Sequence, residues 1–76
     1  MNKNNDILKK FGKRIQQMRL KKGVTSQMAL ANKAGLDRTY IGGVERGERN
    51  IALKNIEKMA VALNISLDEL FKFWLT

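Results

Sequence analysis

The chain has 76 residues with no cysteine, histidine or proline, and 15 lysines and arginines against 7 acidic residues give it a formal net charge of +8. This length predicts one small domain, and the composition excludes disulfides and the usual zinc sites. No apolar run approaches about 20 residues, so we expect neither a signal peptide nor a membrane span. The positive charge indicates a polyanionic partner, either nucleic acid or anionic lipid, or merely a basic soluble domain.

The first predicted helix covers about residues 6–22. Its apolar residues recur at spacings of three and four and form one stripe, as expected of an amphipathic helix. The stripe consists of Ile7, Leu8, Phe11, Ile15 and Met18. Its lysines lie largely off this stripe, and we interpret them as a solvated face. Gly23 follows two lysines and is expected to cap the helix at its C-terminus.

Two short helices follow, over about residues 27–34 and 38–46. Ser26 and Asp37 are the expected N-caps, and Gly35 and Gly47 end the two helices. The turn between them, AGLD, has about four residues, which is typical of a helix-turn-helix whose second helix is free to enter a DNA groove.

The second of these helices has only Ile41 and Val44 as clear core anchors. The adjacent Gly42 and Gly43 weaken it by roughly 2 kcal/mol together, because each glycine disfavours a helix interior. We expect both to point outward, where missing side chains would let the backbone approach DNA. The outer face then offers as groove contacts Arg38, Thr39, Tyr40, Gly42, Gly43 and Arg46.

The last third of the chain predicts two more helices, over about residues 53–63 and 67–75. Asn64 suits a left-handed cap, and Ser66 with Glu69 forms a capping box. The tail is too apolar for a free surface on a small monomer, so it predicts a symmetric dimer interface. Its residues are Leu67, Leu70, Phe71, Phe73 and Trp74. The alternative is that some of them cover the core of the monomer.

The segment SQMALANKAGLDRTYIGGVERGERN resembles the Cro/C1-type (XRE) family of helix-turn-helix DNA-binding proteins, and its second half is similar to the restriction–modification controller proteins. The resemblance covers roughly residues 11–71. It implies an all-α five-helix bundle, one domain with the helix-turn-helix at about residues 27–46, that binds palindromic double-stranded DNA as a homodimer.

The resemblance also assigns roles to individual residues. Arg38, Thr39 and Tyr40 match positions that meet base edges or the groove, and arginine can bond guanine in bidentate fashion. The expected phosphate contacts are Ser26, Gln27, Arg49 and Asn50. Arg19 and Glu45 match a buried ion pair between the first and third helices. Ala52 stands where the family usually has a capping hydroxyl, which leaves Asn50 as the candidate cap.

The residues indicate a cytoplasmic, sequence-specific transcription regulator, and the resemblance to controller proteins implies that it controls its own operon and endonuclease expression. Its partners would be DNA, a second copy and RNA polymerase, without a membrane, cofactor, metal or small-molecule ligand. The alternatives are a phage or plasmid repressor, a DNA-binding antitoxin, and, more remotely, a basic membrane-surface protein. An enzyme is the weakest reading, because the chain offers no phosphate loop and no plausible pair of carboxylates.

Overall fold

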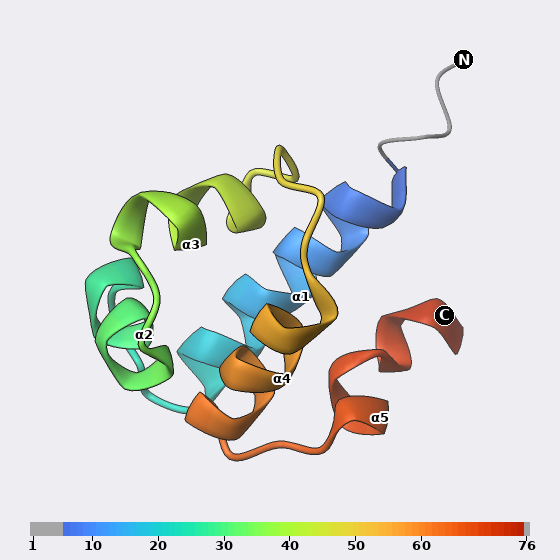
Figure 1. Cartoon of the computed structure of the whole chain (residues 1–76). Helices are drawn as coiled ribbons and strands as arrows, with labels where there is room; N and C mark the ends of the chain where they lie inside the picture. The colour runs from blue at the N-terminus through green and yellow to red at the C-terminus, as the bar shows by residue number, and fades with distance from the viewer. Residues whose placement is uncertain (1–5, 76) are drawn as a thin grey trace.

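A computed structural model describes the backbone of residues 6–75 and the side chains of residues 7–73 (Figure 1). The helices are α1 (Asp6–Lys21), α2 (Gln27–Ala34), α3 (Arg38–Glu45), α4 (Leu53–Ala62), α5 (Leu67–Leu70) and the 3₁₀ helix η1 (Lys72–Leu75). Residues 6–75 contain no strand, so the predicted all-α fold with five α-helices is confirmed. Within this range, no helix has the length and apolar character needed to cross a membrane.

The core lies between α1 and the helices around it. α1 packs against α3 on one side and against α5 and η1 on the other, and α4 packs against α2 (Figure 1). Every α-helix contributes buried apolar side chains, the largest of which are Ile15, Leu30, Ile41, Met59 and Leu70, and Leu63 at the end of α4 is buried with them. The pair α2–α3 therefore rests on a scaffold made by α1 and α4.

The crossing of α1 and α3 depends on Gly12, for which no role was predicted. A Cβ atom at Gly12 would collide with the carbonyl oxygen of Val44 and lie 2.8 Å from that of Glu45. Gly47, with φ of 76°, makes a second close approach, because a Cβ there would lie 2.8 Å from the Cα of Lys9. These glycines let the backbones of α1 and the end of α3 come into direct contact.

The predicted N-caps of the two short helices are confirmed. Ser26 Oγ accepts the N–H three residues ahead at 3.0 Å, and the Asp37 carboxylate accepts the N–H two residues ahead at 2.8 Å. The N-cap of α4 is Ala52, which has no side-chain acceptor, and the structure shows no cap from Asn50 among the described residues. The prediction that Asn50 caps α4 is therefore wrong.

The C-terminal segment differs from the single helix that the sequence predicted. α5 makes one turn, and η1 follows it. Ser66 caps α5 as predicted, but the Glu69 carboxylate pairs with Arg14 and Lys72, at 3.3 and 3.2 Å. Arg14 also donates to the last carbonyl oxygens of α5, those of Glu69 at 2.6 Å and Leu70 at 3.2 Å. This bidentate cap ends the helix and fastens it to α1.

The tail residues do not share one environment. Leu70 is completely buried in the monomer core, so its assignment to a dimer interface is wrong. Phe71 and Phe73 are half-buried, with ring centroids 5.4 and 6.4 Å from that of Phe11. Leu67 is 43% exposed, and the predicted contact through the Trp74 side chain falls outside the described residues.

Candidate nucleic-acid interface

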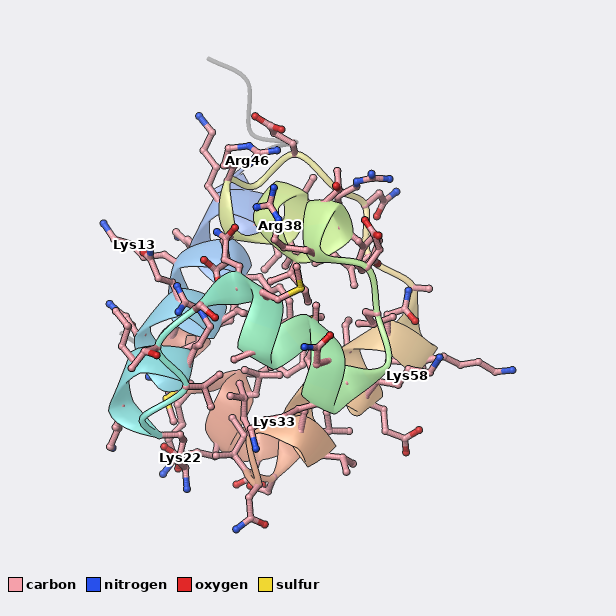
Figure 2. The ribbon with its side chains drawn as sticks, turned by 90° about the vertical axis from the view of Figure 1, so that its left-hand side faces the viewer. Lys13, Lys22, Lys33, Arg38, Arg46 and Lys58 are labelled. Carbon is pink, nitrogen blue, oxygen red and sulfur yellow. The ribbon has the colours of Figure 1, made fainter. Side chains whose placement is uncertain are left out.

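The crossing of α2 and α3 leaves the N-terminus of α3 at the molecular surface (Figure 2). Gly35 closes α2 in the left-handed conformation, with φ of 69°, and turns the chain toward α3. The small, buried Ala31 and Ala34 let the neighbouring helices approach closely. This is the arrangement in which a second helix can enter the major groove of DNA.

Arg38 and Thr39, the first residues of α3, are exposed as the sequence predicted. Asp37 caps the helix, so the backbone beneath these two side chains is fixed. An exposed guanidinium on a rigid helix start suits bidentate recognition of guanine, and a threonine beside it suits a thymine methyl group. Their contact with bases stays a prediction.

The predicted ion pair of Arg19 and Glu45 is present and buried, with side-chain exposures of 6% and 3%. Arg19 Nε and Nη2 donate to the two carboxylate oxygens at 2.7 and 3.2 Å, and Nη1 donates to the Val24 carbonyl oxygen at 3.1 Å. Gln27 Nε2 donates to the same carboxylate at 2.9 Å. One carboxylate thus joins α1, the start of α2 and the end of α3.

The link from Gln27 to Glu45 was not predicted, because the sequence analysis treated Gln27 only as a phosphate contact. Its side chain is half-buried and its orientation is fixed by the carboxylate. Gln27 directly follows the N-cap Ser26, and nothing in the local sequence indicates that its side chain bonds to Glu45, 18 positions away. Its contact with a phosphate stays a prediction.

Tyr40 connects α3 to α4 and faces an arginine of the loop that follows α3. Its hydroxyl oxygen accepts a hydrogen bond from Asn55 Nδ2 at 3.1 Å. The Cζ atom of Arg49 lies 5.3 Å from the centre of its ring, within the range of a cation–π contact. The ring therefore has a fixed orientation, and Arg49 is placed beside it.

Gly42 and Gly43 are buried, so the prediction that they point outward and clear space for DNA is wrong. A Cβ at Gly42 would lie 3.1 Å from Arg46 Nη1 and 3.2 Å from Gln27 Oε1. A Cβ at Gly43 would lie 2.9 Å from Arg49 Cγ. The physical reason is that side chains of this same chain fold over α3 and occupy the space that the glycines leave.

The remaining predicted DNA contacts lie at the surface. Ser26, Arg46, Arg49 and Asn50 are exposed, although Ser26 Oγ already caps α2. Arg46 pairs with Glu48 at 3.1 Å, and both side chains are about 60% exposed, at 59% and 61%. Such an exposed pair is weak, so Arg46 can exchange it for a phosphate at little cost.

Lysines extend the basic character around the helix pair. In Figure 2 five labelled cations, on α1, α2 and α3 or directly after α1 and α3, are seen on the face that carries the helix pair. They are Lys13, Lys22, Lys33, Arg38 and Arg46. A surface rich in positive charge attracts a polyanion before any specific contact forms.

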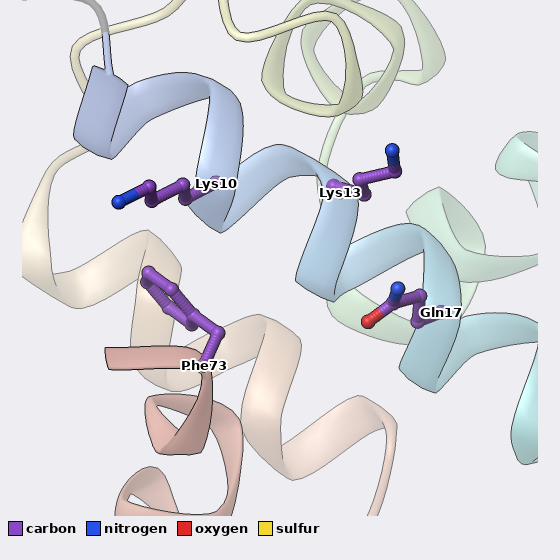
Figure 3. A pocket seen from close by; sticks show the side chains of 4 residues that line it. All are labelled: Lys10, Lys13, Gln17 and Phe73. Carbon is purple, nitrogen blue, oxygen red and sulfur yellow. The ribbon is translucent and has the colours of Figure 1, made fainter. Parts of the chain in front are cut away.

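The described residues offer little for other chemistry. A surface depression of about 360 Å³ lies between α1 and η1, lined by Lys10, Lys13, Gln17 and Phe73 (Figure 3). Within residues 6–75 no three histidine, cysteine, aspartate or glutamate side chains come close enough to hold a metal ion. The fold and the site together define a helix-turn-helix DNA-binding domain.

Comparison with known proteins agrees with this class. The helix-turn-helix family profile matches residues 15–70. Control protein C.MunI of Mycoplasma sp is 43% identical over 67 residues, spanning 88% of this chain and 90% of the relative. Control protein C.BamHI of Bacillus amyloliquefaciens is 45% identical over 69 residues, spanning 91% and 85%.

A solved structure gives the same result. The restriction–modification controller protein C.AhdI from Aeromonas hydrophila superimposes with a TM-score of 0.81 at 55% identity, covering 86% of this chain and 97% of that one. The chain therefore belongs to the Cro/C1-type helix-turn-helix family and, within it, to the restriction–modification controller proteins. It is a DNA-binding transcriptional regulator and not an enzyme.

Proposed function

We propose that the protein acts in the bacterial cytoplasm as the controller of a restriction–modification operon, where it binds a palindromic operator as a homodimer and regulates its own promoter and endonuclease expression. The observation that carries this proposal is the exposed, capped and basic N-terminus of α3 on a chain similar over most of its length to control proteins. In the proposed complex, α3 lies in the major groove.

Base reading is assigned to the first turn of α3. Arg38 and Thr39 reach base edges, and Tyr40 contacts the groove or the sugar, held by Asn55. Arg46 contacts the groove beyond the helix, and phosphates are held at the edges of the site by Ser26, Gln27, Arg49 and Asn50. Phosphate contacts place the helix on the duplex, whereas base contacts select the sequence.

Dimerisation is proposed through the side of the molecule that carries α5. Leu67 is an exposed large apolar residue there, and an apolar groove of about 190 Å³ lies beside α5. The groove is lined by Ile7, Leu8, Phe11, Asn50, Ile51, Ile56 and Phe71. A symmetric dimer would place two α3 helices about 34 Å apart, which is one turn of DNA.

Regulation then depends on how much of the operator is occupied by the protein. In the proposed scheme, low occupancy activates the operon through contact with RNA polymerase, and fuller occupancy represses it. Endonuclease would accumulate only after the methyltransferase has protected the host DNA.

Selection of bound sequences from random double-stranded DNA tests this proposal. We expect enrichment of two inverted half-sites about one helical turn apart, and the same sequence upstream of the gene for this protein. Enrichment of a single asymmetric site would contradict the dimer, and no enrichment at all would contradict sequence-specific regulation.

A further inference from the structure

Arg49 is exposed, but its side chain contacts both α3 and the ring of Tyr40. Its aliphatic stem lies against Gly43, since a Cβ there would be 2.9 Å from Cγ, 3.1 Å from Nε and 3.5 Å from Cδ. Its guanidinium carbon lies 5.3 Å from the centre of the Tyr40 ring. Arg49 is therefore held at two points, by the bare surface of α3 along its stem and by an aromatic ring at its tip.

The backbone does not explain why residue 43 is a glycine. The glycines with positive φ in the described chain are Gly23, Gly35 and Gly47, whereas Gly43 is an ordinary helical residue. Alanine would stabilise an α-helix at such a position. The reason for glycine must lie in the space above it, and that space is filled by Arg49.

The ring beneath the guanidinium is also fixed. Tyr40 is half-buried, and its hydroxyl oxygen accepts the hydrogen bond from Asn55 of α4. The platform for Arg49 is therefore part of the core scaffold. A long side chain held in this way loses less conformational freedom when it binds a ligand than one that moves freely.

We propose that Gly43 is a positioning residue for DNA binding, which keeps Arg49 laid along α3 and over Tyr40 so that its guanidinium is preset for the operator. The inference rests on the proposed function, because it takes Arg49 to be a DNA contact. It replaces the idea that Gly43 lets the DNA itself approach the backbone of α3. Gly43 acts through Arg49 and not by touching DNA.

The free protein gives the first test, without any variant. NMR spectra should show cross-peaks between the Gly43 Hα protons and the Arg49 side-chain protons, and the Arg49 Hδ protons should be shifted upfield by the Tyr40 ring. Absence of both signals in the folded protein would overturn the inference. This measurement also covers the case in which a variant at residue 43 fails to fold.

A double-mutant cycle on the selected operator gives the second test. Gly43→Ala should remove the upfield shift of Arg49, leave the melting temperature equal or higher, and weaken operator binding about tenfold. In an Arg49→Ala background, Gly43→Ala should have no further effect on affinity. A loss that persists without Arg49 would mean that the added methyl meets DNA, and it would overturn the inference.

Gly42→Ala is the matched control, because its added methyl faces Arg46 and Gln27 and not Arg49. It should leave the ring shift of Arg49 unchanged, and loss of that shift would contradict a role specific to Gly43. If Arg49→Ala alone left operator affinity unchanged, the inference would fail while operator binding upheld the proposed function. If the wild type selected no operator, the proposed function would fail, and the NMR spectra would still decide whether Gly43 holds Arg49.

Discussion

Glu45 makes the polar connection between the helix-turn-helix and α1. Its carboxylate accepts bonds from Arg19 and Gln27, and it is almost fully buried. A buried charge that loses its partner remains desolvated and unpaired, which is more costly than the pair is favourable. The network therefore sets the relative position of three helices and not merely their stability.

Glu45→Ala should lower the free energy of unfolding by about 3–5 kcal/mol, because it leaves Arg19 buried without its counter-ion. Urea denaturation followed by circular dichroism measures this loss. The control is Glu48→Ala, which removes the exposed partner of Arg46 and should change stability by less than about 1 kcal/mol. Similar small effects for both variants would contradict a structural role of the buried pair.

Arg38 is the residue expected to read a base. Arg38→Ala should weaken binding to the selected operator by about tenfold or more, the value of one bidentate contact, and should leave binding to random DNA nearly unchanged. Fluorescence anisotropy with both duplexes measures the two affinities. Equal losses on the two DNAs would show that Arg38 contacts only phosphate.

At the scale of the elements, α1 and α3 cross closely at Gly12. Gly12→Ala would place a methyl group against the carbonyl oxygens of Val44 and Glu45, which belong to backbone and cannot rotate away. We expect a loss of stability of about 3 kcal/mol, at the upper end for overpacking, in spite of the better helix propensity of alanine. Thermal unfolding measures it, and an unchanged or higher melting temperature would contradict the close crossing.

The order and type of the elements could be predicted because their signals are local. Ser26 and Asp37 are caps whose hydrogen bonds involve neighbours in sequence, and the bounds of α2 agree with the prediction. The break between α5 and η1 could not be predicted, since Arg14 on α1 caps the end of α5 from more than fifty positions away, at a separation of 55 to 56 residues. The prediction that Asn50 caps α4 failed as well, since the N-cap position is occupied by Ala52 and no side chain caps the helix.

Some features of the candidate site could be predicted from the sequence, and others could not. The exposure of Arg38 and Thr39 could be predicted from their place at the start of the helix. The ion pair of Arg19 with Glu45 was predicted from the resemblance to a family. The burial of Gly42 and Gly43 depends on side chains that fold back from Gln27 and from the loop after α3. Helical periodicity describes which way a residue points, but it contains no information on what covers it.

For the whole molecule, the relevant property is its net charge of +8, of which several cations lie on the face that carries the helix pair. If each half-site uses about four phosphate contacts, a bound dimer neutralises about eight, and the logarithm of the binding constant should fall with the logarithm of salt concentration with a slope near −7. Titrations between low and moderate salt measure this slope. A slope near −3.5 would correspond to one protomer on the DNA and would contradict binding as a dimer.

The proposed function requires this chain to distinguish one DNA sequence from others. The most direct measurement is the ratio of dissociation constants for the selected operator and a scrambled duplex of the same length, at physiological salt. We expect the operator to be bound at least about a thousandfold more tightly, as is typical of specific regulators. A ratio near one would show that the basic face binds DNA only through its charge, and it would contradict the account.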